Sequence, residues 1–169
     1  DTLWLTATLF NTMIDQEPQA LSTVEQLLIG GEALSVSHVR RALSLLPNTA
    51  IINGYGPTES TTFACCYAIP RQLDDNRYSI PIGKPIGNTQ AYILDPHRNP
   101  VPIGVTGELH IGGDGLARGY LNQPELTREK FIANPFIHEA GARLYKTGDL
   151  AQYLPDGNID FLGRIDNQV

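Results

Sequence analysis

The feature that most constrains the fold of this chain is a change in hydrophobic periodicity near its middle. In the first part, short apolar runs alternate with segments whose apolar residues recur at helical spacing. The pattern predicts strands at residues 3–6, 27–29 and 50–52, and helices at residues 9–14 and 35–46. Strands that alternate with helices are typical of a parallel α/β layer.

Beyond residue 79 the pattern changes to short strands that are separated by clusters of turn residues. A polar surface connection at residues 70–79 precedes this part, and within it only residues 124–131 look helical. Asp156 and Gly157 predict a hairpin turn. Spacing of this kind predicts a small antiparallel barrel or sandwich. The predicted strands are residues 90–94, 107–111, 144–146 and 151–154.

Composition limits the classes of function that remain open. The 169 residues are 41% hydrophobic and 18% charged, which is enough for one good core or two small ones. A net charge of −6 without a run of basic residues argues against nucleic acid and anionic membranes as partners. The sequence lacks an apolar run of about 18 residues and a secretory signal, so we expect a cytoplasmic protein. The adjacent Cys65 and Cys66 are interpreted as reduced core residues.

The heptapeptide NGYGPTE at residues 53–59 directly follows the third predicted strand, at the end where open α/β sheets bind ligands. The glycines on either side of Tyr55 let the backbone approach a flat ligand, to which the tyrosine offers a ring face. Thr58 and Glu59 supply oxygen atoms of the kind that Mg²⁺ accepts beside phosphates. The residue types therefore suggest half of a nucleotide site. Taken alone, they also fit a plain strand-to-helix turn whose tyrosine only packs.

Two further polar residues in the second half are candidates, of which Asp149 follows the predicted strand at residues 144–146. Asp149 could accept hydrogen bonds from both hydroxyls of a ribose, or could cap the backbone of a turn. Arg164 could be a fixed cation near a nucleotide, or an ordinary surface arginine. The glycines at positions 112–119 miss the spacing of a phosphate-binding loop and are interpreted as turn glycines.

Four blocks of the sequence together resemble the adenylate-forming superfamily, and more narrowly the adenylation domains of nonribosomal peptide synthetases. They are NGYGPTE, GELHIGGDGLARGYLNQPELTREKF at residues 107–131, YKTGDL at residues 145–150 and GRIDNQV at residues 163–169. The resemblance implies the end of the large subdomain of such an enzyme, a parallel α/β layer followed by a small distorted β-barrel. Residues 1–79 would hold the amino-acid pocket and the adenine-binding motif. Residues 80–169 would be the β-rich subdomain that ends at the hinge.

The resemblance also assigns roles to residues of the nucleotide site. In such enzymes the NGYGPTE tyrosine, here Tyr55, stacks on adenine, with the backbone of Asn53 and Gly54 near the adenine amine. Thr58 and Glu59 would be the catalytic residues at the phosphates, with Glu59 as a Mg²⁺ ligand.

Residues near the C-terminus complete the implied nucleotide site. Asp149 would hold the ribose and Arg164 would contact the nucleotide. Phe161 stands where the family often has a tyrosine, so a hydrogen bond from that hydroxyl is lost here or comes from water. Asp166 matches the hinge about which a smaller C-terminal subdomain swings between two half-reactions.

The family lines its amino-acid pocket with positions that combine bulky walls with two glycines in this sequence. A dry, apolar cavity of that kind suits a small branched aliphatic side chain and resembles the valine-selecting pocket of the family. Isoleucine and leucine remain possible minor substrates, because one methylene is worth only about 1–3 kcal/mol. The positions are Trp4, Leu28, Gly30, Gly54, Thr62 and Phe63.

The resemblance implies activation of L-valine by ATP and Mg²⁺ to an aminoacyl-AMP, followed by loading onto phosphopantetheine of a peptidyl carrier protein beside neighbouring synthetase domains. The family's phosphate loop, amino-group aspartate and C-terminal lysine do not occur in these residues, so we expect residues 1–169 alone to be inactive. One alternative is an acyl- or aryl-CoA ligase of the same superfamily. Others are a nucleotide-binding module without chemistry and a structural or carrier-docking piece.

Overall fold

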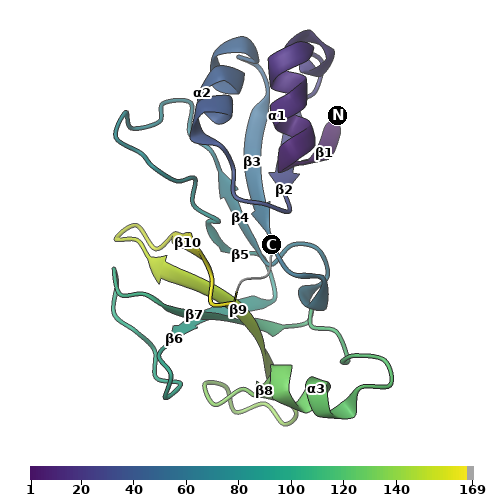
Figure 1. The fold of residues 1–169 in the computed structure, drawn as a ribbon, viewed down its shortest axis with the longest axis vertical. Coiled ribbons are helices and arrows are strands. Elements are labelled where there is room, and N and C mark those ends of the chain that lie inside the picture. Colours follow the sequence, from purple (N-terminus) through teal and green to yellow (C-terminus); the bar gives the residue numbers. More distant parts are fainter. Residues whose placement is uncertain (167–169) are drawn as a thin grey trace.

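The computed structural model describes residues 1–166, so the last three residues of the GRIDNQV block lie outside the described part of the chain. The described residues form two five-stranded sheets. In the view of Figure 1 the first sheet and its two long helices lie above the second sheet, which carries a short helix at its lower end. The change of periodicity in the sequence therefore corresponds to two differently built layers.

The first sheet has the strand order β1-β2-β3-β4-β5. Its first three strands, β1 (Thr2–Thr6), β2 (Gln26–Gly30) and β3 (Ala50–Tyr55), are parallel, as predicted. β4 (Cys65–Ala68) and β5 (Lys84–Pro85) run antiparallel, so the sheet is mixed and not parallel throughout. The physical reason is the short connection between β3 and β4, because a parallel crossover needs about a dozen residues or more.

Two helices cover one face of the first sheet, α1 (Ala7–Gln16) and α2 (Val36–Leu45), and a 3₁₀ turn at Pro18–Leu21 follows α1. Side chains of the preceding residues cap both helices: the hydroxyl of Thr6 accepts from the backbone N–H of Leu9 at 3.3 Å. None of the helices within residues 1–166 is long and apolar enough to cross a membrane.

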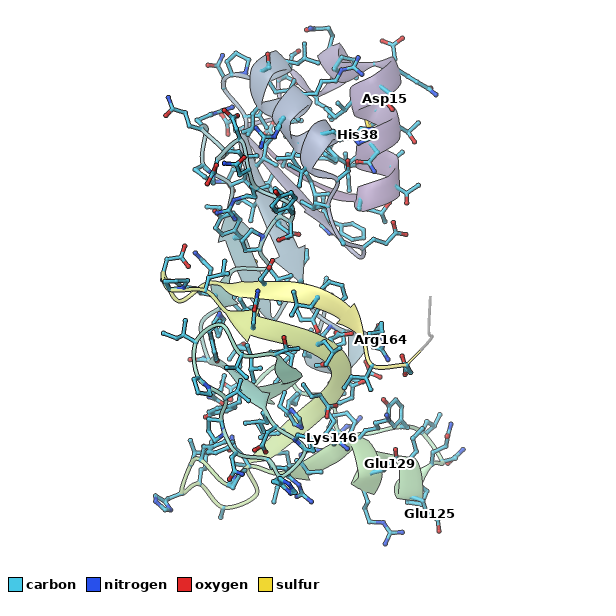
Figure 2. The ribbon with its side chains drawn as sticks, turned by 60° about the vertical axis from the view of Figure 1, so that its left-hand side comes forward. Asp15, His38, Glu125, Glu129, Lys146 and Arg164 are labelled. Carbon is cyan, nitrogen blue, oxygen red and sulfur yellow. The ribbon has the colours of Figure 1, made fainter. Side chains whose placement is uncertain are left out.

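The core of the first layer lies between the helices and the sheet. Phe10 and Ile14 of α1 are fully buried against strand residues such as Leu27 and Ile51. At the surface Asp15 of α1 faces His38 of α2, as Figure 2 shows, with 3.1 Å between Oδ2 and Nε2. Because successive strand residues point to opposite faces, the alternate residues of β1, β2 and β3 face away from the helices.

The second sheet is antiparallel and has the strand order β10-β9-β7-β6. β6 (Thr89–Leu94) and β7 (Gly107–Gly113) are followed by α3 (Pro124–Lys130), which leads into β8 (Phe131–Ala133). The remaining strands, β9 (Arg143–Tyr153) and β10 (Ile159–Arg164), form the predicted hairpin around Asp156 and Gly157.

The prediction of a small barrel in the second half is wrong: the described residues form two sheets and no closed barrel. β7 pairs with one edge of β9, and β8 and β10 both pair with the opposite edge of β9. At the other side of the sheet β6 is the last strand. This arrangement is only four strands wide, and barrels need about eight strands to enclose a side-chain-filled interior.

The two predicted strands at residues 144–146 and 151–154 are a single strand, β9, which spans 11 residues. The sequence pattern broke at the TGD segment because those residues are not part of the regular pleat. The strand continues through them, and one result is that Asp149 lies within β9 and not after a strand.

The two sheets meet where β4 and β5 approach the β9–β10 hairpin. The backbone of Ile159 donates to Gly83 at 2.7 Å and accepts from Ile82 at 2.9 Å. Cys65 of β4 packs with Leu109 and Ile159 in the second core. The junction brings the carboxyl end of β3 against β9, which is where the candidate site lies.

Candidate functional site

The heptapeptide NGYGPTE is half strand and half turn. The prediction placed the end of the third strand at residue 52, but β3 continues through Tyr55, and a 3₁₀ turn follows at Thr58–Ser60. Gly54 pairs with Gly30 of β2 on one side and with Cys66 of β4 on the other. The strand continues because β4 folds back along it and satisfies its backbone.

The position of Tyr55 and Gly54 in one strand sends them to opposite faces of the sheet. Against Gly54 lies the ring of Phe63: a Cβ built on this glycine would be 2.4 Å from its Cε1. Tyr55 instead reaches the second sheet, where its hydroxyl donates to Asp149. Two neighbouring residues therefore contribute to two separate surfaces.

A polar cluster surrounds the Tyr55 hydroxyl. Asp149 accepts from Tyr55 through Oδ2, and through Oδ1 from Nη1 of Arg164 at 3.1 Å. Arg164 also forms a two-pronged bond with Asp166, at 2.9 and 3.0 Å. The ring of Phe161 lies 6.3 Å from the Tyr55 ring, centroid to centroid. The structure thus brings together five residues that were predicted separately.

Burial and hydrogen bonds together set the charge states in this cluster. Burial raises the pKa of Asp149 above its usual range, whereas the bonds from Tyr55 and Arg164 favour its charged form. Burial and the neighbouring carboxylate raise the pKa of Tyr55, so its hydroxyl stays protonated and donates. The hydrogen bond to Asp166 is the main cause of a raised pKa at Arg164, which keeps the guanidinium charged.

Asn53 precedes Gly54 in β3 and lies at the junction of the two sheets. Its side chain is buried, and Nδ2 donates to the carbonyl of Pro81 at 2.8 Å. That bond ties β3 to the connection that enters β5. The side chain therefore holds the strand in place at the junction between the two sheets.

Glu59 is held by residues of the block at 107–131, to which the sequence analysis assigned no contact with Glu59. Its Oε1 accepts from the hydroxyl of Tyr120 at 2.5 Å, and its carbonyl accepts from the N–H of Ala117 at 2.7 Å. The Tyr145 hydroxyl lies 3.4 Å from that of Tyr120. Burial raises the pKa of both tyrosines, so they remain neutral donors. Thr58 beside this network is exposed.

A cavity of about 340 Å³ lies on the Gly54 side of the strand. Of the six residues predicted for the amino-acid pocket, the structure places four in its wall, and Gly30 lies next to Gly54. Leu28 is on the same face, paired with Trp4 of β1, but does not line the cavity. The lining residues are Trp4, Gly31, Gly54, Gly56, Thr58, Thr61, Thr62 and Phe63.

Two threonines of the cavity wall have strained backbone. Thr61 and Thr62 have φ values of 58° and 67°, in the left-handed region that β-branched residues rarely adopt. The Thr61 hydroxyl donates to the carbonyl of Gly115 at 2.8 Å, which holds the segment in this shape. Gly115 lies in a turn as predicted, whereas Gly112 and Gly113 are the last residues of β7.

The sequence interpretation missed three residues that support the site, namely Glu108, Tyr120 and Tyr145. Glu108 accepts from the N–H of Gly148, next to Asp149. An acidic residue inside the apolar run GELHIGG is a usable signal, since a carboxylate in such a strand needs a partner. Tyr120 and Tyr145 follow glycine-rich or charged segments. Their positions in the sequence do not indicate that Glu59 is their partner.

Comparison with known proteins agrees with this geometry. The sequence model of the AMP-binding enzyme family matches residues 1–121. The chain therefore belongs to the AMP-binding enzyme family.

More particularly, the chain is similar to short parts of several much longer synthases. It is 55% identical to tyrocidine synthase 3 of Brevibacillus parabrevis over 99% of its own length, but spans 2% of that protein. Gramicidin S synthase 2 of Brevibacillus brevis is 51% identical over 99% of the chain, which spans 4% of that protein.

A solved structure shares the fold. PA1221, a nonribosomal peptide synthetase protein containing adenylation and PCP domains, superposes with a TM-score of 0.92 at 45% identity. The comparison covers 100% of this chain and 34% of that one. The arrangement of two sheets described above is therefore the arrangement found in a member of the family.

Proposed function

We propose that this chain forms part of an enzyme that activates L-valine with ATP. The amino-acid carboxylate and ATP would give an aminoacyl-AMP and pyrophosphate. The phosphopantetheine thiol of a peptidyl carrier protein would then take the acyl group as a thioester, with release of AMP. The observation that carries the proposal is the placement of Tyr55 and Gly54 on opposite faces of one strand end. This placement supports binding of a nucleotide on the Tyr55 side and of an amino acid on the Gly54 side, at adjacent residues.

The residues of the first surface fit a nucleotide. Asp149 is a buried carboxylate with the acceptor oxygens that ribose hydroxyls require. The half-buried ring of Tyr55 beside it would stack on adenine. Arg164 supplies a fixed positive charge beside Asp149. Catalysis at such a site rests mainly on positioning and on stabilisation of charge.

Glu59 fits the role of a Mg²⁺ ligand. Its carboxylate is oriented by Tyr120, and oxygen atoms are the donors that Mg²⁺ accepts. Within residues 1–166 no group of three or more His, Cys, Asp or Glu residues is placed to hold a metal ion without further ligands. The remaining ligands would be phosphate oxygens and water, and the ion would neutralise charge on the phosphates.

The second surface supports a small apolar amino-acid side chain. Among the described residues that line the cavity, none is charged, and Trp4 and Phe63 form its aromatic walls. A charged substrate side chain would lose its hydration there without gaining an opposite charge. Valine fits these limits, and the discrimination against isoleucine should be about 10- to 200-fold at most.

The test is amino-acid-dependent ATP–pyrophosphate exchange by the complete synthetase that carries these residues. Valine should support the highest kcat/KM in a panel that includes isoleucine, leucine, phenylalanine and aspartate. Exchange with aryl or fatty acids in place of amino acids would instead favour a CoA ligase. ATP binding without exchange would favour a nucleotide-binding module, and no nucleotide binding would favour a docking piece. Residues 1–169 alone should show no exchange.

A further inference from the structure

Strand β9 carries a bulge at the residues that include Asp149. Its pairing with β7 breaks between Lys146 and Leu150. Leu109 of β7 alone therefore faces residues 147–149 of β9, so the bulged strand has two residues more than its partner. Bulges of this kind bend a strand and turn a side chain in a new direction. Here the side chain is the carboxylate of Asp149.

Hydrogen bonds within β9 and between β9 and β7 satisfy the backbone that the bulge releases. The Thr147 hydroxyl donates to the Leu109 carbonyl at 2.7 Å and accepts from the N–H of Asp149 at 3.0 Å. The N–H of Gly148 donates to Oε1 of Glu108 at 3.2 Å. Gly148 has a φ of 73°, which a glycine adopts without strain. Each of the three bulge residues is thus fixed by a named partner.

Glu108 clamps one side of the bulge and Arg164 clamps the other. Arg164 Nη1 donates to the Thr147 carbonyl at 2.9 Å and to Asp149 at 3.1 Å. The Glu108 side chain is only 22% exposed, and the buried ring of His110 packs beneath it, 4.0 Å from Nε2 to Oε2. A hydrogen bond to a partly buried carboxylate is stronger than one between neutral groups.

We propose that Glu108 is a positioning residue for nucleotide binding: by holding Gly148, it directs the Asp149 carboxylate towards the ribose hydroxyls. This inference deepens the proposed function and rests on it. Glu108 itself makes no contact with the nucleotide in this proposal. A substitution of Glu108 should therefore change the kinetics only with nucleotides that carry the ribose hydroxyls.

The test compares ATP with 2′,3′-dideoxy-ATP in pyrophosphate exchange by the complete synthetase. Glu108→Ala should lower kcat/KM for ATP about tenfold, since a hydrogen bond to a charged group is lost. It should leave kcat/KM for dideoxy-ATP and the KM for the amino acid within about twofold, because no ribose hydroxyl or pocket residue is involved. The preference for ATP over its dideoxy analogue should thus fall about tenfold.

Three further variants complete the design. Glu108→Gln keeps an acceptor for the Gly148 N–H and should restore most of the preference. Glu108→Asp keeps the charge, but its side chain is one methylene shorter, so it should lose the preference for ATP over dideoxy-ATP. It replaces Glu108→Ala in the test if the alanine variant does not fold. Glu125→Ala, at an exposed position of α3, is the matched control and should behave as wild type.

The outcomes separate the inference from the function beneath it. Equal losses with ATP and dideoxy-ATP, or unchanged kinetics, would overturn the positioning role. A wild-type enzyme that shows exchange but no preference for the ribose hydroxyls would overturn it as well. A wild-type enzyme without exchange would refute the proposed function itself, and with it the inference.

Discussion

The hydroxyl of Tyr55, the last residue of β3, donates a hydrogen bond to the carboxylate of Asp149 in β9. The two residues are 94 positions apart in the sequence and belong to different sheets. Their bond joins the sheets at the point where we propose that the nucleotide binds. It also occupies one oxygen of the carboxylate that would receive the ribose.

Removing this hydroxyl while keeping the ring separates its two roles. Tyr55→Phe should lower the free energy of unfolding by about 1.5–3 kcal/mol, because a bond to a buried charged group is lost. ATP affinity should change little, since the phenyl ring still stacks. Tyr55→Leu should weaken ATP binding at least as strongly as it lowers stability. Denaturant unfolding measures the change in stability, and calorimetry measures the affinity for ATP. A loss of ATP affinity in Tyr55→Phe that is larger than the loss in Tyr55→Leu would contradict this interpretation.

Gly54 should tolerate no side chain, because Phe63 occupies the space. In Gly54→Ala the new Cβ would lie 2.4 Å from Phe63 Cε1, so the ring must move into the cavity. We expect the KM for the amino acid to rise about tenfold or more, with a much smaller change for ATP, since a misplacement of about 1 Å costs that much or more. Steady-state exchange kinetics give both values.

The double variant Gly54→Ala with Phe63→Leu checks the cause of that effect. Leucine is smaller and leaves room for the new methyl group, so the amino-acid KM should partly recover. If the double variant is as impaired as the two single changes added together, the contact with Phe63 is not the reason.

The bond from Tyr120 to Glu59 should matter for Mg²⁺. Tyr120→Phe removes the donor that orients this carboxylate, so the Mg²⁺ concentration for half-maximal exchange should rise several-fold, towards the roughly 10- to 100-fold range of outer-shell changes. Tyr145→Phe is the comparison variant. The hydroxyl of Tyr145 lies 3.4 Å from that of Tyr120, so it is a weaker hydrogen-bond partner of Tyr120 than Glu59 is. A Mg²⁺ titration that is identical in wild type and Tyr120→Phe would refute the role.

The two cysteines should differ in their reaction with thiol reagents. Cys65 is fully buried, and burial raises its pKa to about 12, so little of the reactive thiolate exists at pH 8. Cys66 is partly exposed, and its raised pKa has the same cause. Its labelling should therefore accelerate about tenfold per pH unit between pH 7 and 9, while Cys65 stays unlabelled in the folded chain.

The variants Cys65→Ser and Cys66→Ser assign the labelled position. Folded Cys66→Ser should remain unmodified by a chromogenic disulfide reagent at pH 8 and should react once unfolded in urea. Fast labelling of this variant in its folded state would show that Cys65 is accessible, contrary to the packing described above.

Local elements of the fold were predictable because they depend on neighbours in the sequence. Helical spacing of apolar residues located α1 and α2, and Asp156 with Gly157 located the hairpin of β9 and β10. The same local signals misplaced the end of β3 and divided β9 into two strands. In both cases pairing with another strand extended the element beyond its own apolar run.

The sequence suggested the chemistry of the site, but not its arrangement. Residue types alone left Tyr55, Asp149 and Arg164 open between nucleotide binding and ordinary structural roles, and the four sequence blocks that resemble adenylation domains predicted the nucleotide. Only the tertiary structure decided that Glu108 holds the bulge that carries Asp149, and that the second sheet stays open. Strand register and hydrogen bonds between distant segments decide these features, because they form only when the two sheets pack together.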